Sequence, residues 1–257
     1  MRLGANPVLA SHIAWDTAPM RSGLDRTENP GWLLDETASA GRENLDPTHV
    51  SRYDDKENAD APAEIELLAS LGVDADSAVI DIGAGTGQFT VAAAPRCRHV
   101  TAIDISDVML DRLRTKVAGI ANVSVEHAGF LTFDDSRPAV DAVYSRYALH
   151  HLPDFWKVVA LQRIHRVLRP GGIFRLWDVV YGFPAADAAD RIEQWCATGG
   201  SDVGSDWLRP EMEEHVRDEH STFSWLLEPM IESAGFAIDR SEYSEDGFAA
   251  KYILTKR

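Results

Sequence analysis

A glycine-rich segment at residues 79–89 constrains the fold of this chain more than any other feature. It reads Val-Ile-Asp-Ile-Gly-Ala-Gly-Thr-Gly-Gln-Phe and lies between an apolar run and a helix-forming stretch. Glycine lets the backbone approach a ligand closely, and free N–H groups at a helix start attract negative charge. A dinucleotide fingerprint would need glycine where Gln88 stands, and the Gly-Lys pair of a phosphate loop is absent. The segment favours a ligand-binding turn over a tight turn with no ligand.

Strands and helices alternate over residues 57–180. A first helix is expected after Asp60, whose side chain can cap it, because Pro62 stands in its first turn and apolar residues follow at helical spacing. Five buried strands are predicted, over residues 78–82, 99–105, 123–126, 140–145 and 173–179. The helices between them are predicted over residues 87–94, around 109–117, and over 154–168. This alternation predicts an α/β fold with a doubly wound, mostly parallel sheet.

Asp104 lies near the end of the second predicted strand, 17 residues after Gly87. In a doubly wound sheet, this strand end neighbours the glycine-rich turn at the topological switch point. A carboxylate there can accept hydrogen bonds from both hydroxyls of a ribose. The alternative is a helix-capping role, but Ser106 and Asp107 already meet that need for the following helix. We therefore expect Asp104 to bind a ribose.

The chain resembles the class I S-adenosylmethionine-dependent methyltransferases over residues 57–180. The resemblance rests on four motifs in the family's order: the glycine segment, Ala102-Ile-Asp-Ile-Ser106, Tyr144-Ser-Arg-Tyr-Ala-Leu-His-His-Leu-Pro153 and Val167-Leu-Arg-Pro-Gly-Gly172. It implies a Rossmann-like fold with a seven-stranded sheet. It also implies S-adenosyl-L-methionine as cofactor, S-adenosyl-L-homocysteine as product, and a small molecule as methyl acceptor.

The resemblance further implies roles for individual residues. The three glycines of the segment would contact the methionyl part of the cofactor, with Arg146 beside it. Asp104 would hold the ribose, and Ile105 and Met109 would pack on the adenine. The full cofactor-binding set expected in this way is Tyr53, Asp81, Gly83, Gly85, Gly87, Gln88, Asp104, Ile105, Met109, Gly129, Phe130 and Arg146.

The segment after the third strand departs from the family pattern. Many members carry an acid and a small residue there, whereas this chain has His127-Ala-Gly-Phe130. Adenine recognition is therefore expected from backbone groups around Gly129, with Phe130 packing nearby. Tyr53 is similar to an aromatic residue that the family often folds over the cofactor, and a tyrosine on a surface helix is the alternative.

Methyl transfer from a sulfonium is an in-line displacement, which needs alignment, close approach and exclusion of water. It demands no metal, and no metal site is expected. A general base helps when the acceptor is a hydroxyl, an ammonium or an unactivated carbon. The candidates at the carboxyl ends of strands four and five are His150, His151 and Asp178. The alternatives are structural, with the histidines capping the next helix or packing on the sheet and the aspartate capping strand five.

The composition along the chain suggests four regions. Residues 1–56 are polar and irregular yet carry several aromatic residues, so we expect an arm that serves partly as a lid. Residues 57–180 form the Rossmann-like core, and residues 181–222 a helical lid or substrate insertion. Residues 223–257 are expected to add a helix and an antiparallel β-hairpin that completes the sheet.

Aromatic residues gather in the segment that leaves strand five. They are Tyr181, Phe183, Trp195, Trp207, Phe223 and Trp225. One interpretation is an aromatic lid over an apolar substrate pocket, which would supply the dryness that methyl transfer needs. The other is the core of a small helical addition, and both can hold if one or two rings face the substrate.

The net charge of −16 narrows the choice of partners. Acidity argues against nucleic acid and anionic membranes, because both are bound through Lys and Arg clusters. The net charge is −5 over residues 1–60, −2 over 61–180 and −9 over 181–257. Acidity therefore lies on the arm and on the C-terminal part, where the acceptor should enter. We expect an apolar or aromatic small-molecule acceptor, and a monomer or a homodimer.

Two cysteines, Cys97 and Cys196, are too few for a disulfide framework or a four-cysteine zinc site and are typical of a reducing cytoplasm. Neither a signal peptide nor a membrane-spanning apolar run is recognised, so a cytoplasmic location is expected. Two other functions stay open. One is methylation of RNA or protein, and the other is a non-catalytic module that binds the cofactor through the same fold.

Overall fold

The computed structural model describes residues 30–40, 42–50, 60–200 and 208–257. The chain divides into two compact units, residues 1–33 and residues 34–257. Every helix and strand described below belongs to the second unit. Tyr53 and Trp207, two residues expected near the ligands, lie outside the described residues.

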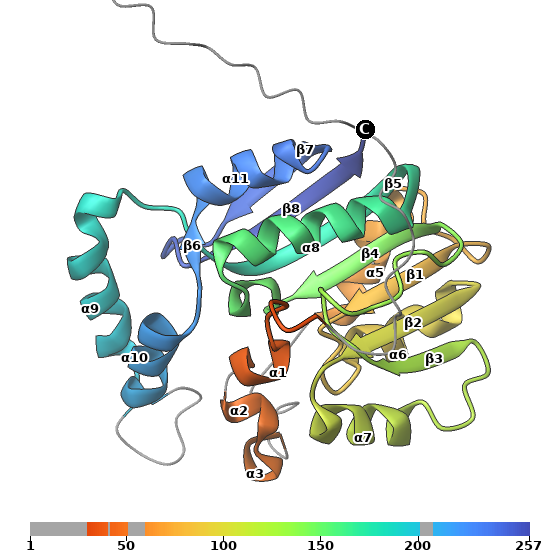
Figure 1. Cartoon of the computed structure of the whole chain (residues 1–257), viewed down its shortest axis with the longest axis horizontal. Coiled ribbons are helices and arrows are strands. Elements are labelled where there is room, and N and C mark those ends of the chain that lie inside the picture. Colours follow the sequence, from red (N-terminus) through yellow and green to blue (C-terminus); the bar gives the residue numbers. More distant parts are fainter. Residues whose placement is uncertain (1–29, 41, 51–59, 201–207) are drawn as a thin grey trace, which may run out of the picture. The chain divides into compact units, whose positions relative to one another are not determined.

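A single sheet forms the centre of the second unit (Figure 1). Its strands are β1 (Ala78–Ile82), β2 (His99–Asp104), β3 (Val123–His127), β4 (Val140–Arg146), β5 (Leu168–Tyr181), β6 (Thr222–Phe223), β7 (Phe236–Tyr243) and β8 (Ala249–Lys256). The order is β3-β2-β1-β4-β5-β8-β7, and the short β6 pairs with β5 off this path. Strands β1 to β5 are mutually parallel, whereas β8 is antiparallel to β5 and β7. The expected doubly wound, mostly parallel sheet is confirmed, and β6 adds an eighth strand to the seven.

Helices connect β1 to β2, β2 to β3 and β4 to β5, whereas a loop connects β3 to β4. Further helices precede β1 and follow β5. The longer ones are α5 (Ala61–Ser70), α6 (Gln88–Ala93), α7 (Asp107–Lys116), α8 (Asp154–Val167), α9 (Ala188–Thr198), α10 (Arg209–Asp218) and α11 (Ser224–Ser233). Short ones are α1 (Glu36–Ser39), α2 (Arg42–Leu45), α3 (Pro47–Val50), and the 3₁₀ turns η1 (Ala94–Arg96), η2 (Leu149–His151) and η3 (Ala185–Asp187). Among the residues with described structure, no helix is both long and apolar enough to cross a membrane.

Two helix starts show how local sequence sets these boundaries. Ser106 caps α7, since its hydroxyl accepts a hydrogen bond from the Met109 N–H at 3.2 Å. Asp60 stands at the N-cap of α5 with Pro62 just inside, as expected, but its side chain makes no capping bond to the helix. Its backbone is left-handed, with φ of +43°. The prediction of the boundary was therefore right, and the expected side-chain cap was wrong.

Strand β5 begins earlier than the sequence predicts, at Leu168 rather than residue 173. The chain passes from α8 directly into the sheet, and a register shift between Val140 and Ala142 of β4 absorbs the extra residues. The bulge requires glycine at position 172, because a Cβ there would lie only 2.9 Å from the carbonyl oxygen of Arg169, which is too close for a side chain. The Pro-Gly-Gly sequence is thus a bulge within a strand and not a loop before one.

The core packs α5 and α6 against the parallel strands. Ile65 and Leu68 of α5 meet Phe89 of α6, Val79 of β1 and Val100 of β2 in one buried cluster. Burial of such side chains stabilises the fold by about 1.5–3 kcal/mol each. Helices α8 and α11 lie side by side over the C-terminal half of the sheet (Figure 1). This frame fixes the carboxyl ends of β1, β2, β4 and β5 relative to one another.

Candidate active site

The glycine loop between β1 and α6 exposes bare backbone. Gly83, Gly85 and Gly87 have φ of +74°, +52° and +85°, a region that other residues adopt at a cost. A Cβ on Gly83 would lie 2.4 Å from Cβ of Ala148, and one on Gly87 would lie 2.9 Å from Cγ of Leu113. The loop therefore requires glycine for its conformation and also for its close packing.

Asp104 is tied into this loop at the end of β2. Its Oδ2 accepts a hydrogen bond from the Gly85 N–H at 2.8 Å, and its Oδ1 accepts one from the Ser106 N–H at 2.8 Å. Burial raises the pKa of Asp104, and the backbone N–H groups of Ser106 and Gly85 oppose that rise. The two N–H bonds fix the orientation of the carboxylate and leave it further lone pairs for a ligand.

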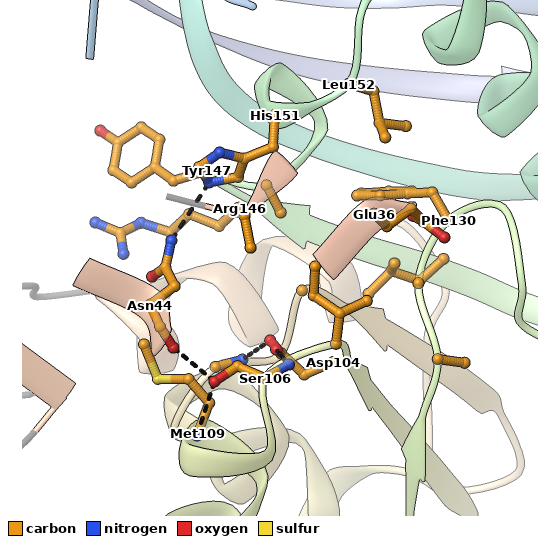
Figure 2. Close-up of a pocket in the computed structure, with 18 residues that line it drawn as sticks. Glu36, Asn44, Asp104, Ser106, Met109, Phe130, Arg146, Tyr147, His151 and Leu152 are labelled. Carbon is orange, nitrogen blue, oxygen red and sulfur yellow. Dashed lines mark hydrogen bonds between the residues drawn. The ribbon is translucent and has the colours of Figure 1, made fainter. Parts of the chain in front are cut away.

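A pocket opens over the carboxyl ends of β1, β2 and β4, with about 640 Å³ of empty space including its open mouth. Figure 2 shows Asp104 and Ser106 below it and His151 above it. The expected cofactor residues that line it are Gly83, Gly85, Asp104, Ile105, Met109, Gly129, Phe130 and Arg146. Residues far apart in the sequence are thus brought together here, at the place where doubly wound sheets bind ligands.

Two further expected residues, Asp81 and Gln88, line a second, smaller pocket beside the first. The two pockets share Gly83, Gly85 and Arg146. Asp81 is buried and accepts a hydrogen bond from the Thr90 hydroxyl at 2.6 Å. Burial raises the pKa of Asp81 to about 7, with a further rise from the charge of Asp104. Gly87, at the N-cap of α6, lines neither pocket.

Arg146 sits between two aromatic rings at the boundary of the two pockets. The guanidinium carbon lies 4.3 Å from the ring centroid of Tyr147 and 4.6 Å from that of Trp177. Tyr147 has a left-handed backbone, with φ of +48°, which is rare for a bulky residue. Its N–H donates to the carbonyl oxygen of Trp177 at 2.8 Å, which helps to hold that conformation. Such strain concentrates at functional sites.

The adjacent histidines, which sequence alone treats alike, have different surroundings. His150 is buried, with Nδ1 2.5 Å from Oδ1 of Asp178 and Nε2 2.9 Å from Oε2 of Glu219. Oε2 of Glu219 also contacts Nδ1 of His215. His151 instead lines the large pocket, where Nε2 lies 3.5 Å from Nδ2 of Asn44 (Figure 2).

These surroundings give the two rings different charge states. Burial disfavours a charged His150, but Asp178 and Glu219 outweigh it and raise the pKa of His150 to about 10. Burial and the neighbouring charge of His150 lower the pKa of His151 to about 3. Burial would raise the pKa of Glu219, yet the bonds from His150 and His215 lower it well below its usual range. At neutral pH, His150 is therefore a cation and His151 a neutral imidazole.

Three side chains of this region carry no signal in the sequence. Glu36 of α1 and Asn44 of α2 line the large pocket, and Glu219 follows α10. The backbone oxygen of Asn44 accepts a hydrogen bond from the Ser106 hydroxyl at 2.5 Å, so α2 is fixed beside the start of α7. The positions of Glu36, Asn44 and Glu219 depend on tertiary contacts, so neither their spacing in the sequence nor their residue type predicts a place in the site.

The aromatic residues after β5 pack mainly on one another. Tyr181, Phe183 and Phe248 are buried together, with Trp195 and Phe223 packed against them. None of these rings lines either pocket in the described part of the chain. Trp225 stacks on Phe223 and is 56% exposed. Apart from Trp225, the described rings thus form the core of the added helical region, and none of them lines the pockets.

The chain is similar to known methyltransferases. The family of methyltransferase domains matches residues 79–172. A demethylmenaquinone methyltransferase of Staphylococcus aureus is 35% identical over a 196-residue alignment, and the match covers 73% of this chain and 79% of that protein. Among solved structures, a SAM-dependent methyltransferase from Aquifex aeolicus has a TM-score of 0.57 at 17% identity, covering 83% of this chain and 100% of that one.

A cyclopropane synthase from Mycobacterium tuberculosis has a TM-score of 0.59 at 17% identity, covering 87% of this chain and 95% of that one. At such identity, the two solved structures show the shared fold alone. The 35% identical relative and the matching domain family carry the assignment further. This chain belongs to the class I S-adenosylmethionine-dependent methyltransferases and transfers a methyl group from S-adenosyl-L-methionine to a small-molecule acceptor.

Proposed function

We propose that S-adenosyl-L-methionine binds across the glycine loop, with its ribose at Asp104 and its methionyl part beside Arg146, and that the acceptor enters beside His151. The observation that carries this proposal is one pocket lined by the glycine loop, Asp104 and His151 together. Cofactor and acceptor must meet at near-attack distance, so a shared pocket is the arrangement that the chemistry needs.

The residues present fit this cofactor. The glycine loop offers backbone without side chains, in a conformation that a Cβ would disrupt. Tyr144 lines the smaller pocket, and its buried hydroxyl has no hydrogen-bond partner among the described residues. Buried polar groups in native proteins are rarely left unpaired, so a polar ligand group at this position is supported.

When bound, the cofactor would supply a methyl group on a sulfonium. The acceptor would bond to the methyl carbon in line with the carbon–sulfur bond, and the sulfur would leave as the thioether of S-adenosyl-L-homocysteine. This chain contributes the geometry and one proton acceptor. His151 is neutral because its pKa is low, so one ring nitrogen keeps a lone pair. Its contact with Asn44 is 3.5 Å long, and an acceptor hydroxyl can replace it and donate a hydrogen bond to Nε2, which takes the proton as the acceptor bonds to the methyl carbon. His150 is a buried cation that pairs with Asp178 and Glu219. We assign it the role of holding the turn that carries His151 in place.

We propose a hydroxylated aromatic ring as the acceptor class. The similar Staphylococcus aureus protein is named for demethylmenaquinone, which supports an aromatic, quinone-type acceptor. Ile105, Phe130 and Leu152 give the large pocket an apolar lining. A hydrogen bond from the ring hydroxyl to His151 raises the electron density of the ring, so an oxygen or a ring carbon can attack the methyl group, and the hydroxyl proton leaves as the new bond forms.

We also propose that the protein works in the cytoplasm. Cys97 and Cys196 are both buried and free, which fits a reducing compartment. Cell fractionation with detection of the native chain tests this location, and recovery in a membrane or extracellular fraction would contradict it.

The acceptor class is tested with the purified full-length chain, S-adenosyl-L-methionine and a panel of hydroxylated naphthalenes and benzenes. Mass spectrometry should detect a methylated ring and S-adenosyl-L-homocysteine in equal amounts. The same rings without hydroxyls serve as controls and should give neither product. Product formed only when RNA or a protein is added would contradict the proposed acceptor. Cofactor binding with no product from any acceptor would favour a non-catalytic module.

A further inference from the structure

Glu36, the first residue of α1, places a buried carboxylate in the large pocket. Its side chain lies beside Phe130 (Figure 2) and is only 7% exposed. Oε2 accepts a hydrogen bond from the Leu131 N–H at 3.0 Å and lies 3.4 Å from the Thr132 hydroxyl. Burial raises the pKa of this carboxyl to about 7, against the effect of the Leu131 and Phe130 N–H groups. A carboxylate is seldom buried without a function or a strong partner.

The loop after β3 is shaped to receive this side chain. A Cβ on Gly129 would lie 2.4 Å from Oε1 of Glu36, so any other residue there would displace the carboxylate. The same loop contributes no acid of its own: His127 lies outside both pockets, with Nε2 2.9 Å from the carbonyl oxygen of Ile105. The acidic group on this side of the pocket therefore comes from α1.

We propose that Glu36 recognises the exocyclic amine of the cofactor's adenine ring and so makes the pocket selective for adenine over other purines. This inference rests on the proposed binding of S-adenosyl-L-methionine in the same pocket. Glu36 shares that pocket with Asp104, Ile105 and Met109, so an adenosine whose ribose is held by Asp104 has its base within the same enclosure.

The chemistry favours an amine over a carbonyl at this point. A carboxylate has about four lone-pair positions, and the loop uses only part of them. The exocyclic amine of adenine can donate a hydrogen bond to a Glu36 oxygen. Hypoxanthine has a carbonyl oxygen at that position, which only accepts hydrogen bonds and would be repelled by the carboxylate. Hydrogen bonds to charged groups are the stronger kind, and an unmatched buried group is costly. The alternative is that Glu36 only ties α1 to the loop at residues 129–132.

The test compares two ligands on the full-length chain by isothermal titration at pH 8, where a carboxyl with a pKa of about 7 is mostly ionised. The ligands are S-adenosyl-L-homocysteine and its deaminated analogue, S-inosyl-L-homocysteine. Wild type should bind the adenine form about ten- to a hundredfold more tightly. Glu36→Gln keeps the shape and one acceptor but adds a donor, so the ratio should fall to about threefold or less. Glu232→Gln, an exposed glutamate on α11, is the matched control and should keep the wild-type ratio.

Gly129→Ala gives a second, independent variant, because it moves the carboxylate without removing it. It should also lower the ratio, and it decides the question if Glu36→Gln fails to fold. An unchanged ratio in the folded Glu36 variant, or in folded Gly129→Ala where the first does not fold, would overturn the inference and leave Glu36 as an anchor of α1. Failure of wild type to bind either ligand, or full binding by Asp104→Ala, would instead overturn the proposed cofactor site. The two failures are therefore distinguishable.

Discussion

The carboxylate of Asp104 shows how one residue joins two parts of the site. Its two oxygens accept hydrogen bonds from Gly85 in the glycine loop and from Ser106 at the start of α7, each at 2.8 Å. Removing the carboxylate therefore changes the glycine loop as well as the proposed ligand contact. The type and place of this residue were predictable, because a strand-end acid beside a glycine turn has few other uses.

Asp104→Ala should abolish measurable binding of S-adenosyl-L-homocysteine, a loss of at least about a hundredfold, because the loop and the proposed ribose site lose the same acceptor. Circular dichroism should still show a folded chain. Asp111→Ala, an exposed residue on α7, is the control and should bind normally. Near wild-type affinity in the Asp104 variant, measured by isothermal titration, would remove Asp104 from the site.

The two adjacent histidines have different surroundings, and we propose that only His151 accepts a proton. His151→Ala should lower turnover by roughly a hundredfold or more, the range of a lost proton acceptor, with little change in cofactor affinity. Steady-state kinetics at saturating acceptor separates the two effects. His99→Ala, which lies at the start of β2 and outside both pockets, is the control. Unchanged turnover in the His151 variant would make that ring structural.

Residue type and spacing predicted the glycines, Asp104 and the histidine pair, but could not rank the histidines. That ranking depends on Asp178 and Glu219, which stand 28 and 69 residues from His150 in the sequence. Glu36 was missed for the same reason. A glutamate in a polar N-terminal segment looks like a surface residue until Gly129 is seen to leave room for it.

At the scale of elements, strand and helix order followed from periodicity, whereas the exact junctions did not. The C-terminal hairpin of β7 and β8 was predicted from two strand-like runs, and its pairing is antiparallel as expected. The early start of β5 was not predicted, because a Pro-Gly-Gly sequence normally indicates a turn. Only the pairing of Leu168 with Val140 makes a bulged strand possible there.

The glycine loop offers a stability test at this scale. Gly83→Ala combines a left-handed backbone with a Cβ 2.4 Å from Ala148, whereas Gly119→Ala has a similar φ of +88° and nothing within 4 Å. The difference between the two variants isolates the steric overlap. We expect Gly83→Ala to lower the free energy of unfolding by about 1–3 kcal/mol more than Gly119→Ala, in urea denaturation. Equal losses would mean that the loop tolerates a side chain.

Glu219 connects the end of α10 to η2 and β5 through His150, and this link should depend on pH. The pKa of Glu219 is lowered by folding, so its contribution to stability is present above about pH 4.5 and is lost as the pH falls. The pKa of His150 is raised from 6.5 to about 10, so its contribution is complete below pH 6.5 and is lost as the pH rises toward 10. The link is therefore strongest between these limits.

Glu219→Gln should lower the free energy of unfolding by about 3 kcal/mol near pH 6, the order expected for breaking a buried ion pair. The loss relative to wild type should shrink below pH 4 and above pH 9. Urea denaturation at three pH values measures it, with the exposed Glu232→Gln as control. A loss that is equal at all three pH values would mean that packing, and not charge, holds the link.

At the scale of the whole molecule, the charge is unevenly distributed. The core that carries the proposed cofactor pocket is close to neutral, whereas residues 181–257 carry a net charge of −9. Helices α9 and α10 add several exposed acids, of which Glu193 and Glu213 pair with Arg209. Exposed ion pairs of this kind stabilise the fold little. The net negative charge of this region acts mainly on charged molecules that approach the protein. It disfavours a polyanionic acceptor and is compatible with a neutral ring.

Ligand binding should also be visible in the stability of the whole chain. Because the pocket joins α1, α2, the glycine loop and η2, a ligand that binds only the folded state stabilises all of them at once. S-adenosyl-L-homocysteine at a hundred times its dissociation constant should add about 2.7 kcal/mol, which is roughly 5–10 °C in melting temperature for a chain of this length. Differential scanning fluorimetry measures the shift, which should grow with the logarithm of ligand concentration. Asp104→Ala should show no shift at the same concentrations, while Asp111→Ala should follow wild type. A shift of wild-type size in the Asp104 variant would mean that the ligand stabilises the chain from a different site.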